Sequence, residues 1–165
     1  MEWFHREHDR ERRCVEEGCG DRGVSTLRVT QVLLPLLRAG GGGDIVVVTS
    51  TAGHDTYPGW GGYVAAQHAE RTIANTLRFE LVGEPIRVIE IAPGMVHTEE
   101  FSLNRLHGDH KAAASVYAGV DAPLVAEDVA DAIVWAITWP AHVNVGSMIL
   151  RPRAQASNTV VARQA

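Results

Sequence analysis

The hydrophobic positions of the chain fall into alternating helix-like and strand-like runs. Apolar residues recur at helical spacing over Val24–Arg38, which predicts an amphipathic helix with Ser25 as its N-cap and a kink at Pro35. The run Ile45–Thr49 is apolar and mostly β-branched, and it predicts a strand buried on both faces. A second long helix is predicted over Tyr63–Leu81.

The alternation continues to the end of the chain. A second buried strand is predicted over Ile86–Ile91, a third helix over Val125–Trp139 and a short third strand over Met148–Leu150. Strands that alternate with helices are typical of an α/β fold with a parallel sheet. The polar, weakly periodic stretch Thr98–Val120 is predicted to be a mobile lid.

The glycines of the chain separate a turn from a candidate site. Gly40–Gly43 follows a helix and opens a strand, so it is interpreted as a helix C-cap and turn, because phosphate-binding loops have the opposite order. Ser50 ends the first strand, and Tyr63 opens the next helix thirteen residues later. In open α/β sheets ligands bind at the carboxyl ends of strands, so this hydroxyl and this phenol are candidate site residues.

These segments resemble a known family. Val48–Gly53 together with Tyr63–Ala69 resembles the active-site segment of the short-chain dehydrogenases/reductases, in which a serine precedes x-Ala-Gly and Tyr-x-x-x-Lys follows. Gln67 stands where that family has its lysine. Ile91–Thr98 resembles the family's cofactor loop, and the similarity covers roughly 27–157. Tyr57-Pro-Gly and the segment that begins at Arg151 resemble the branch with NADP-dependent 3-hydroxy acid and serine dehydrogenases.

The resemblance implies a fold and a set of roles. It implies a partial doubly wound, Rossmann-like parallel sheet of about three strands with three main helices, truncated at the N-terminus so that the family's first four strands and its glycine-rich cofactor turn are missing. It implies Ser50 and Tyr63 as catalytic residues. The cofactor is expected to be NADP or NAD, and the residues implied in binding it are Gln67, Pro93, Gly94, Val96 and Thr98.

The implied reaction is oxidation or reduction of a small hydroxy acid or alcohol. A tyrosine transfers a proton near neutral pH only if its pKa falls from about 10, and a neighbouring cation lowers it. Gln67 can donate hydrogen bonds but carries no charge, so we expect activity to be impaired or lost in this chain. Two alternatives stay open: a site completed by a full-length homologue, and a non-enzymatic interaction module.

Length and charge limit the remaining possibilities. A chain of 165 residues predicts one domain, here 24–157, with 1–23 disordered or irregular and 158–165 a tail. A net charge of −5 argues against nucleic acid, and no apolar run is long enough to span a membrane. Two cysteines are too few for a zinc site and fit a cytoplasmic protein, and no metal site is expected.

Self-association is the last expectation. The strand Ile45–Thr49 would lie at an open, apolar edge if the family's preceding strands are missing, and such edges favour pairing between chains. The small residues Ala65, Ala66 and Ala69 of the helix 63–81 allow close approach by another helix, and ordinary core packing explains them equally well. By resemblance, a homo-oligomer would form through the helices 24–38 and 63–81.

Overall fold

The computed structural model describes residues 20–98 and 110–164, and these form an α/β fold built on one sheet. All strands are parallel and lie in the order β1-β2-β3. The strands are β1 (Gly43–Val48), β2 (Ile86–Pro93) and β3 (Ser147–Leu150). The helices are α3 (Gly20–Ala39), the 3₁₀ turn η2 (Thr51–Gly53), α4 (Gly61–Glu80), α6 (His110–Tyr117) and α7 (Ala126–Ile137). The predicted fold class of three parallel strands with three main helices is confirmed.

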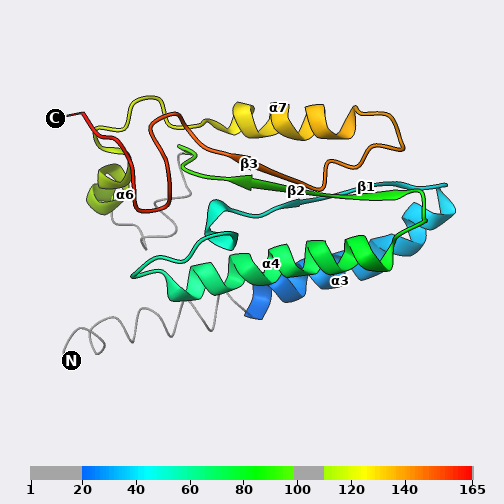
Figure 1. The fold of residues 1–165 in the computed structure, drawn as a ribbon. Coiled ribbons are helices and arrows are strands. Elements are labelled where there is room, and N and C mark those ends of the chain that lie inside the picture. The colour runs from blue at the N-terminus through cyan, green and yellow to red at the C-terminus, as the bar shows by residue number, and fades with distance from the viewer. Residues whose placement is uncertain (1–19, 99–109, 165) are drawn as a thin grey trace.

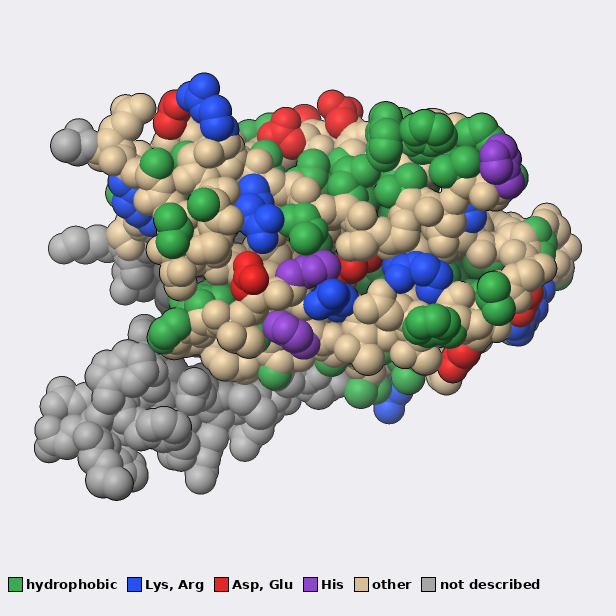
Figure 2. Space-filling model, in the orientation of Figure 1, with side chains coloured by type: hydrophobic (Ala, Val, Ile, Leu, Met, Phe, Trp, Pro, Cys, Tyr) green, Lys and Arg blue, Asp and Glu red, His purple; other side chains and the backbone are tan. Residues whose placement is uncertain are grey.

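The sheet lies between two helical layers. Helices α3 and α4 run side by side over one face, and α7 covers the other (Figure 1). Alternate residues of the central strand point into the two cores, with Val88 towards α4 and Ile89 towards α7. Figure 2 shows apolar side chains gathered over α7 and the turn after it, where Val134, Trp135 and Trp139 are exposed. None of the helices in the described ranges has the length and apolar composition that a membrane span requires.

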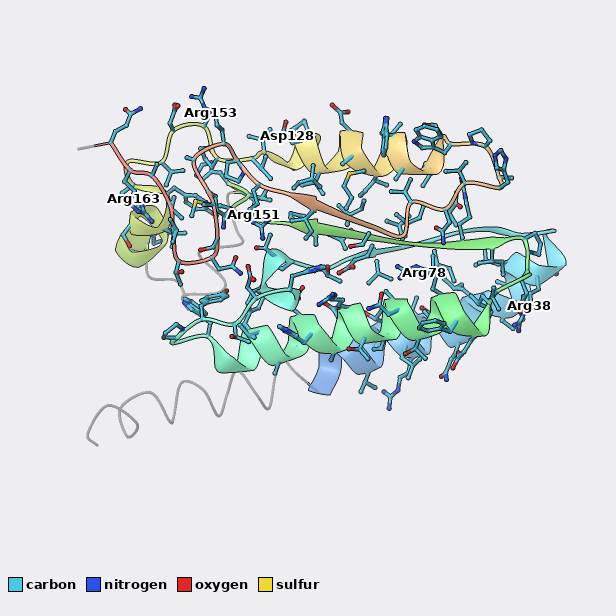
Figure 3. The ribbon with its side chains drawn as sticks, in the orientation of Figure 1. Arg38, Arg78, Asp128, Arg151, Arg153 and Arg163 are labelled. Carbon is cyan, nitrogen blue, oxygen red and sulfur yellow. The ribbon has the colours of Figure 1, made fainter. Side chains whose placement is uncertain are left out.

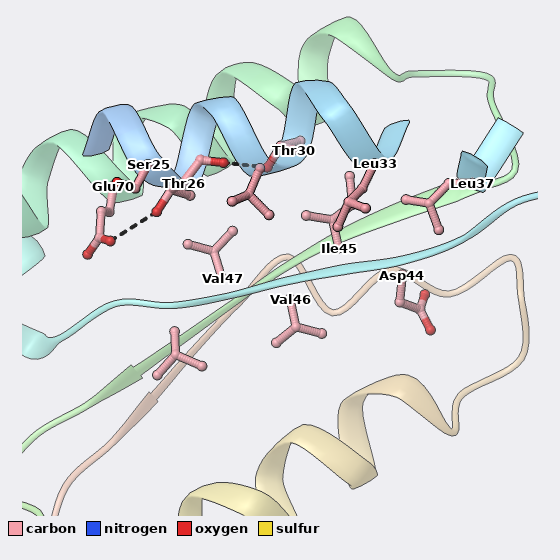
Figure 4. Close-up of a pocket in the computed structure, with 12 residues that line it drawn as sticks. Ser25, Thr26, Thr30, Leu33, Leu37, Asp44, Ile45, Val46, Val47 and Glu70 are labelled. Carbon is pink, nitrogen blue, oxygen red and sulfur yellow. Dashed lines mark hydrogen bonds between the residues drawn. The ribbon is translucent and has the colours of Figure 1, made fainter. Parts of the chain in front are cut away.

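The first strand differs from its prediction. β1 was expected to be buried on both faces, but among its residues only Val47 is buried, and Val48 is 49% exposed. The reason is topological: within the described residues β1 pairs with β2 alone and forms the sheet edge. A groove of about 510 Å³ runs between β1 and α3, and Leu33, Ile45 and Val47 point into it (Figure 4).

Several helix boundaries also differ from the predicted ones. Helix α3 begins at Gly20, so the predicted start at Val24 and the N-cap at Ser25 are wrong, and the helix continues through Pro35 to Ala39. The turn predicted after it is confirmed, because the Gly42 N–H donates to the Leu37 carbonyl at 2.9 Å. The rest of the predicted irregular segment, 1–19, lies outside the described residues, as do residues 99–109 of the predicted lid. Helix α6 had not been predicted.

Arg78 joins three elements beneath the sheet. It points from α4 towards the strands (Figure 3), and its Nε donates to the Val88 carbonyl of β2 at 3.1 Å. Another nitrogen donates to the carbonyl of Gly146, next to β3, and a third to Asn75 on its own helix at 2.7 Å. These bonds hold the last turn of α4 against the amino-terminal part of β2 and the residue before β3.

Candidate active site

Ser50 lies at the carboxyl end of β1, in an extended conformation that starts the turn η2. The Thr49 N–H still donates to the Ile91 carbonyl at 2.8 Å, so the strand pairing reaches as far as the residue before Ser50. The buried Ser50 Oγ accepts the Ala52 N–H at 3.1 Å and caps the turn. Accepting that bond does not use the hydroxyl hydrogen, so Ser50 can still donate to a substrate oxygen.

The serine turn packs directly on α4. A Cβ atom built on Gly53 would lie 2.8 Å from the Gln67 carbonyl oxygen, so only glycine permits this approach. The Arg71 Nη1 donates to the Gly53 carbonyl at 3.1 Å and holds the same contact from the next turn. Tyr63 is half-buried in the first turn of α4, one turn before Gln67. The elements that carry Ser50 and Tyr63 therefore meet at the carboxyl end of β1.

Gln67 is almost fully buried, with 3% of its surface exposed. Its Nε2 donates to Glu70 Oε2 at 2.9 Å, and Glu70 Oε1 accepts from Thr26 of α3 at 3.2 Å. The amide must face Glu70 with its nitrogen, because its oxygen would repel the carboxylate. The Gln67 Oε1 atom is left buried and finds no partner among the described residues. That atom is suited to a hydroxyl donor.

The predicted cofactor loop follows β2, and many of its backbone groups are paired within the chain. Pro93 is the last residue of the strand, and the Gly94 N–H donates to the Leu150 carbonyl at 2.7 Å. Val96 forms a parallel bridge with Leu124, and its carbonyl accepts the Tyr117 hydroxyl at 2.8 Å. Thr98 is half-buried and is the last described residue of this segment. The predicted loop is therefore braced by α6 and by the segment before α7.

The carboxyl-terminal segment lies over both strand ends, which sequence reasoning missed. The Gln155 Oε1 accepts the Met95 N–H at 2.8 Å and occupies the space where a Gly94 Cβ would stand. Asn158, predicted to lie in a tail, instead bonds both the hydroxyl and the carbonyl of Thr51, at 2.6 and 3.2 Å. No local pattern in the sequence signals such contacts. The segment therefore contacts the serine turn at Thr51.

Arg151 brings positive charge to the same end of the sheet. It follows β3 directly and lies where the carboxyl-terminal segment crosses the strands (Figure 3). Its Nη2 is 3.5 Å from the Asp55 carboxylate, in the loop that follows the serine turn. The Nε atom of Arg151 is buried and has no partner among the described residues.

Glu90 is a buried carboxylate on the central strand, with 1% of its surface exposed. It accepts hydrogen bonds from the hydroxyls of Thr49 and Ser147, each at 2.8 Å, and its Oε1 lies 3.0 Å from His54 Nε2. Burial alone raises the pKa of this carboxyl, but the bonds from Ser147, Thr49 and His54 and the charge of His54 hold the pKa below its ordinary value. An acidic residue between the apolar residues Ile89 and Ile91 of a buried strand was the signal that could have identified it.

Comparison with known proteins places the chain among oxidoreductases. The family model described as short chain dehydrogenase matches residues 23–106. An uncharacterised oxidoreductase of Mycobacterium tuberculosis is 53% identical over 134 residues, 81% of this chain and 53% of the relative. A sulfoacetaldehyde reductase of Chromohalobacter salexigens is 41% identical, over 79% of this chain and 51% of the relative. The NADP-dependent 3-hydroxy acid dehydrogenase of Schizosaccharomyces pombe is 35% identical, over 86% and 54%.

Solved structures agree with these relatives. The closed form of serine dehydrogenase complexed with NADP⁺ superposes with a TM-score of 0.77 at 33% identity, and the match covers 85% of this chain and 56% of that one. Serine dehydrogenase from Escherichia coli gives a TM-score of 0.62 at 30% identity, over 79% and 50%. The chain spans about half the length of the curated relatives it matches.

Proposed function

The chain belongs to the short-chain dehydrogenase/reductase family, and on that premise we propose that it carries the substrate side of a nicotinamide-dependent oxidoreductase for small hydroxy acids or alcohols. The observation that carries the proposal is the contact of the serine turn with α4 at Gln67, which brings the elements of Ser50 and Tyr63 together. The similar proteins include hydroxy acid and serine dehydrogenases, which supports this substrate class.

Ser50 and Tyr63 divide the work on the substrate oxygen. The Ser50 hydroxyl, held from behind by the Ala52 N–H, donates to that oxygen and orients it. The Tyr63 hydroxyl gives or takes the proton as the carbinol and carbonyl forms interconvert. The nicotinamide, when bound, supplies or accepts the hydride.

The residues present fit the nicotinamide end of the cofactor. The buried, unpartnered Gln67 Oε1 is an acceptor that a ribose hydroxyl would satisfy. Pro93, Gly94, Val96 and Thr98 would hold the nicotinamide itself, since they follow the central strand at its carboxyl end. NADP is the cofactor that we propose first, because NADP⁺ is bound in the serine dehydrogenase complex and the similar 3-hydroxy acid dehydrogenase is NADP-dependent.

We also propose that turnover is impaired, because the described part of the site lacks a cation at position 67. The amide of Gln67 donates to Glu70 and cannot stabilise a phenolate as a positive charge would. Loss of such assistance to general acid–base catalysis costs about 10²–10⁴ in rate. A lysine introduced at this position would meet the Glu70 carboxylate, so the carboxylate has to be removed with it.

The test is therefore a double substitution. Purified wild-type chain, Gln67→Lys and Gln67→Lys/Glu70→Gln are titrated with NADPH by fluorescence and assayed on 3-hydroxy acids. We expect turnover to rise at least about tenfold in the double variant and less in the single one. Thr76→Lys adds the same charge on the exposed face of α4 and should change nothing. Fast turnover by the wild type would contradict the impairment, and absence of NADPH binding in all variants would contradict the oxidoreductase proposal.

The open edge favours a second candidate function, association with another polypeptide. The groove beside β1 is lined largely by apolar residues of α3 and β1, and Val48 and Leu33 are exposed on it (Figure 4). Such an edge suits a homo-oligomer through α3 and α4, an interaction module, or completion of the site by a full-length homologue. Co-expression with a full-length relative followed by size-exclusion chromatography tests this. A defined hetero-complex that gains activity on 3-hydroxy acids supports completion, whereas an inactive complex supports the interaction module.

A further inference from the structure

The buried Glu90 carboxylate joins the two flanks of the serine turn. Thr49 precedes Ser50 directly, and His54 follows Gly53 at the other end of the turn. Both bond the same oxygen, Oε1, at 2.8 and 3.0 Å, while the other oxygen bonds Ser147 of β3 at 2.8 Å. One carboxylate on the central strand thus holds the beginning and the end of the turn that presents Ser50.

The bonding pattern also fixes the state of the His54 ring. An ionised carboxylate only accepts hydrogen bonds, so His54 must carry a hydrogen on Nε2. The backbone N–H of His54 donates to the Thr51 carbonyl at 3.0 Å, so the residue that carries the ring is also bonded to η2. Displacing the turn would therefore break two bonds to one buried charge.

Packing alone does not account for an acidic residue at this position. Val88, on the same side of the strand, and Ile91, the next residue along, are buried with apolar side chains. Burying a carboxylate costs free energy unless donors surround it, whereas an apolar side chain would carry no such cost. Hydrogen bonds to a charge are directional, so they can fix the place of a turn in a way that apolar contacts cannot.

We propose that Glu90 is a positioning residue that, through Thr49 and His54, holds the Ser50 hydroxyl in place for the substrate. The proposal rests on the function proposed above for Ser50. It assigns Glu90 no contact with the substrate or the cofactor, so its effect must reach the reaction through the geometry of the turn.

Hydrogen exchange of the turn amides tests the positioning claim without any need for activity. The N–H groups of Ala52, Gly53 and His54 bond Ser50 Oγ, the Ser50 carbonyl and the Thr51 carbonyl. In Glu90→Gln, which keeps the shape but loses the charge, we expect these amides to exchange about tenfold faster while amides of α4 and α7 keep their rates. Glu84→Gln is the matched control, since Glu84 pairs with Arg38 on the surface, far from the turn in the fold.

A second pair of variants guards against misfolding of Glu90→Gln. Thr49→Val removes one donor to Glu90, and Thr49→Ser restores it. Thr49→Val should reproduce the faster exchange of the turn amides and Thr49→Ser should return it to the wild-type rate. Equal rates in Thr49→Val and wild type, or faster exchange spread evenly over the whole molecule in Glu90→Gln, would overturn the proposal.

Kinetics then separate positioning from the proposed function itself. If the Gln67→Lys/Glu70→Gln protein turns over, adding Glu90→Gln should lower kcat while the Kd for NADPH stays unchanged, because Ser50 acts on the substrate. An equal loss in both quantities would overturn the positioning role. If no variant turns over, the proposed function fails, and the exchange rates of the turn amides still decide whether Glu90 holds the turn.

Discussion

The carboxyl end of the sheet and the outer edge of β1 are held in different ways. At the carboxyl end, Glu90, Gln155 and Asn158 each bond a backbone or side-chain group of a neighbouring segment. These hydrogen bonds fix the positions of the loops. Along the outer edge, Leu33 and Val48 expose apolar surface to a groove. The directional hydrogen bonds of the first region favour one geometry, whereas the apolar surface of the second favours burial without fixing the orientation of a partner.

This difference predicts unequal sensitivity to substitution. A polar network loses several bonds when one member changes, and a close backbone approach cannot absorb an added methyl group. An exposed apolar edge can change its side chains with little effect on the folded monomer, because those side chains are already in contact with water. Substitutions at the carboxyl end should therefore affect folding, and substitutions at the edge should affect association.

The largest effect is expected from Gly53→Ala. The added Cβ would stand 2.8 Å from the Gln67 carbonyl oxygen, which belongs to helix backbone and cannot move aside cheaply. We expect the free energy of unfolding to fall by about 2 kcal/mol in urea denaturation. Gly23→Ala is the control, because its Cβ would meet Ala69 and Ile73 at ordinary contact distances of 3.6 and 3.7 Å. That variant should be as stable as the wild type or gain up to about 1 kcal/mol, and equal losses in both would refute the steric explanation.

A smaller effect is expected from the charge of Glu90, and it should depend on pH. The folded-state pKa of this carboxyl lies below the ordinary 4.5, so its contribution is present above that value and lost as the pH falls through the folded pKa. Glu90→Gln should lower the free energy of unfolding by about 1–1.5 kcal/mol at pH 7. The difference in unfolding free energy between Glu90→Gln and the wild type should narrow as the pH falls below 4.5 and through the folded-state pKa. A gap that is constant over this range would mean that the carboxylate charge contributes nothing.

The sequence pattern predicted the elements because their signals are local. The helix 63–81 and the strand 86–91 were placed to within about two residues, because each period is local to its segment and the breakers Gly83 and Pro85 lie between the two segments. Burial of β1 on both faces could not be judged in the same way, because burial of a strand depends on the presence of neighbours on both sides.

The site was predictable only in part for the same reason. Ser50 and Tyr63 could be paired because a motif joins them within one short stretch. The bond between Thr51 and Asn158 connects residues 107 positions apart, and the one between His54 and Glu90 spans 36. Nothing local in the sequence encodes which distant donor a buried carboxylate will find. The bond from the Gln67 amide nitrogen to Glu70 likewise depended on how the side chain packs.

The smallest effect on folding, and the clearest test of the outer edge, is expected from Val48→Lys. Val48 is 49% exposed at the end of the edge strand, and a charged lysine there opposes pairing with a second chain. We expect the wild type to self-associate at micromolar concentration and Val48→Lys to shift towards monomer in analytical ultracentrifugation, with the free energy of unfolding changed by less than about 0.5 kcal/mol. Val134→Lys makes the same substitution at a 55% exposed position of α7, on the opposite face of the sheet, and should leave association unchanged. If Val134→Lys instead dissociates the protein and Val48→Lys does not, the chains associate through the apolar surface of α7. The edge of β1 then stays exposed to solvent in the assembly.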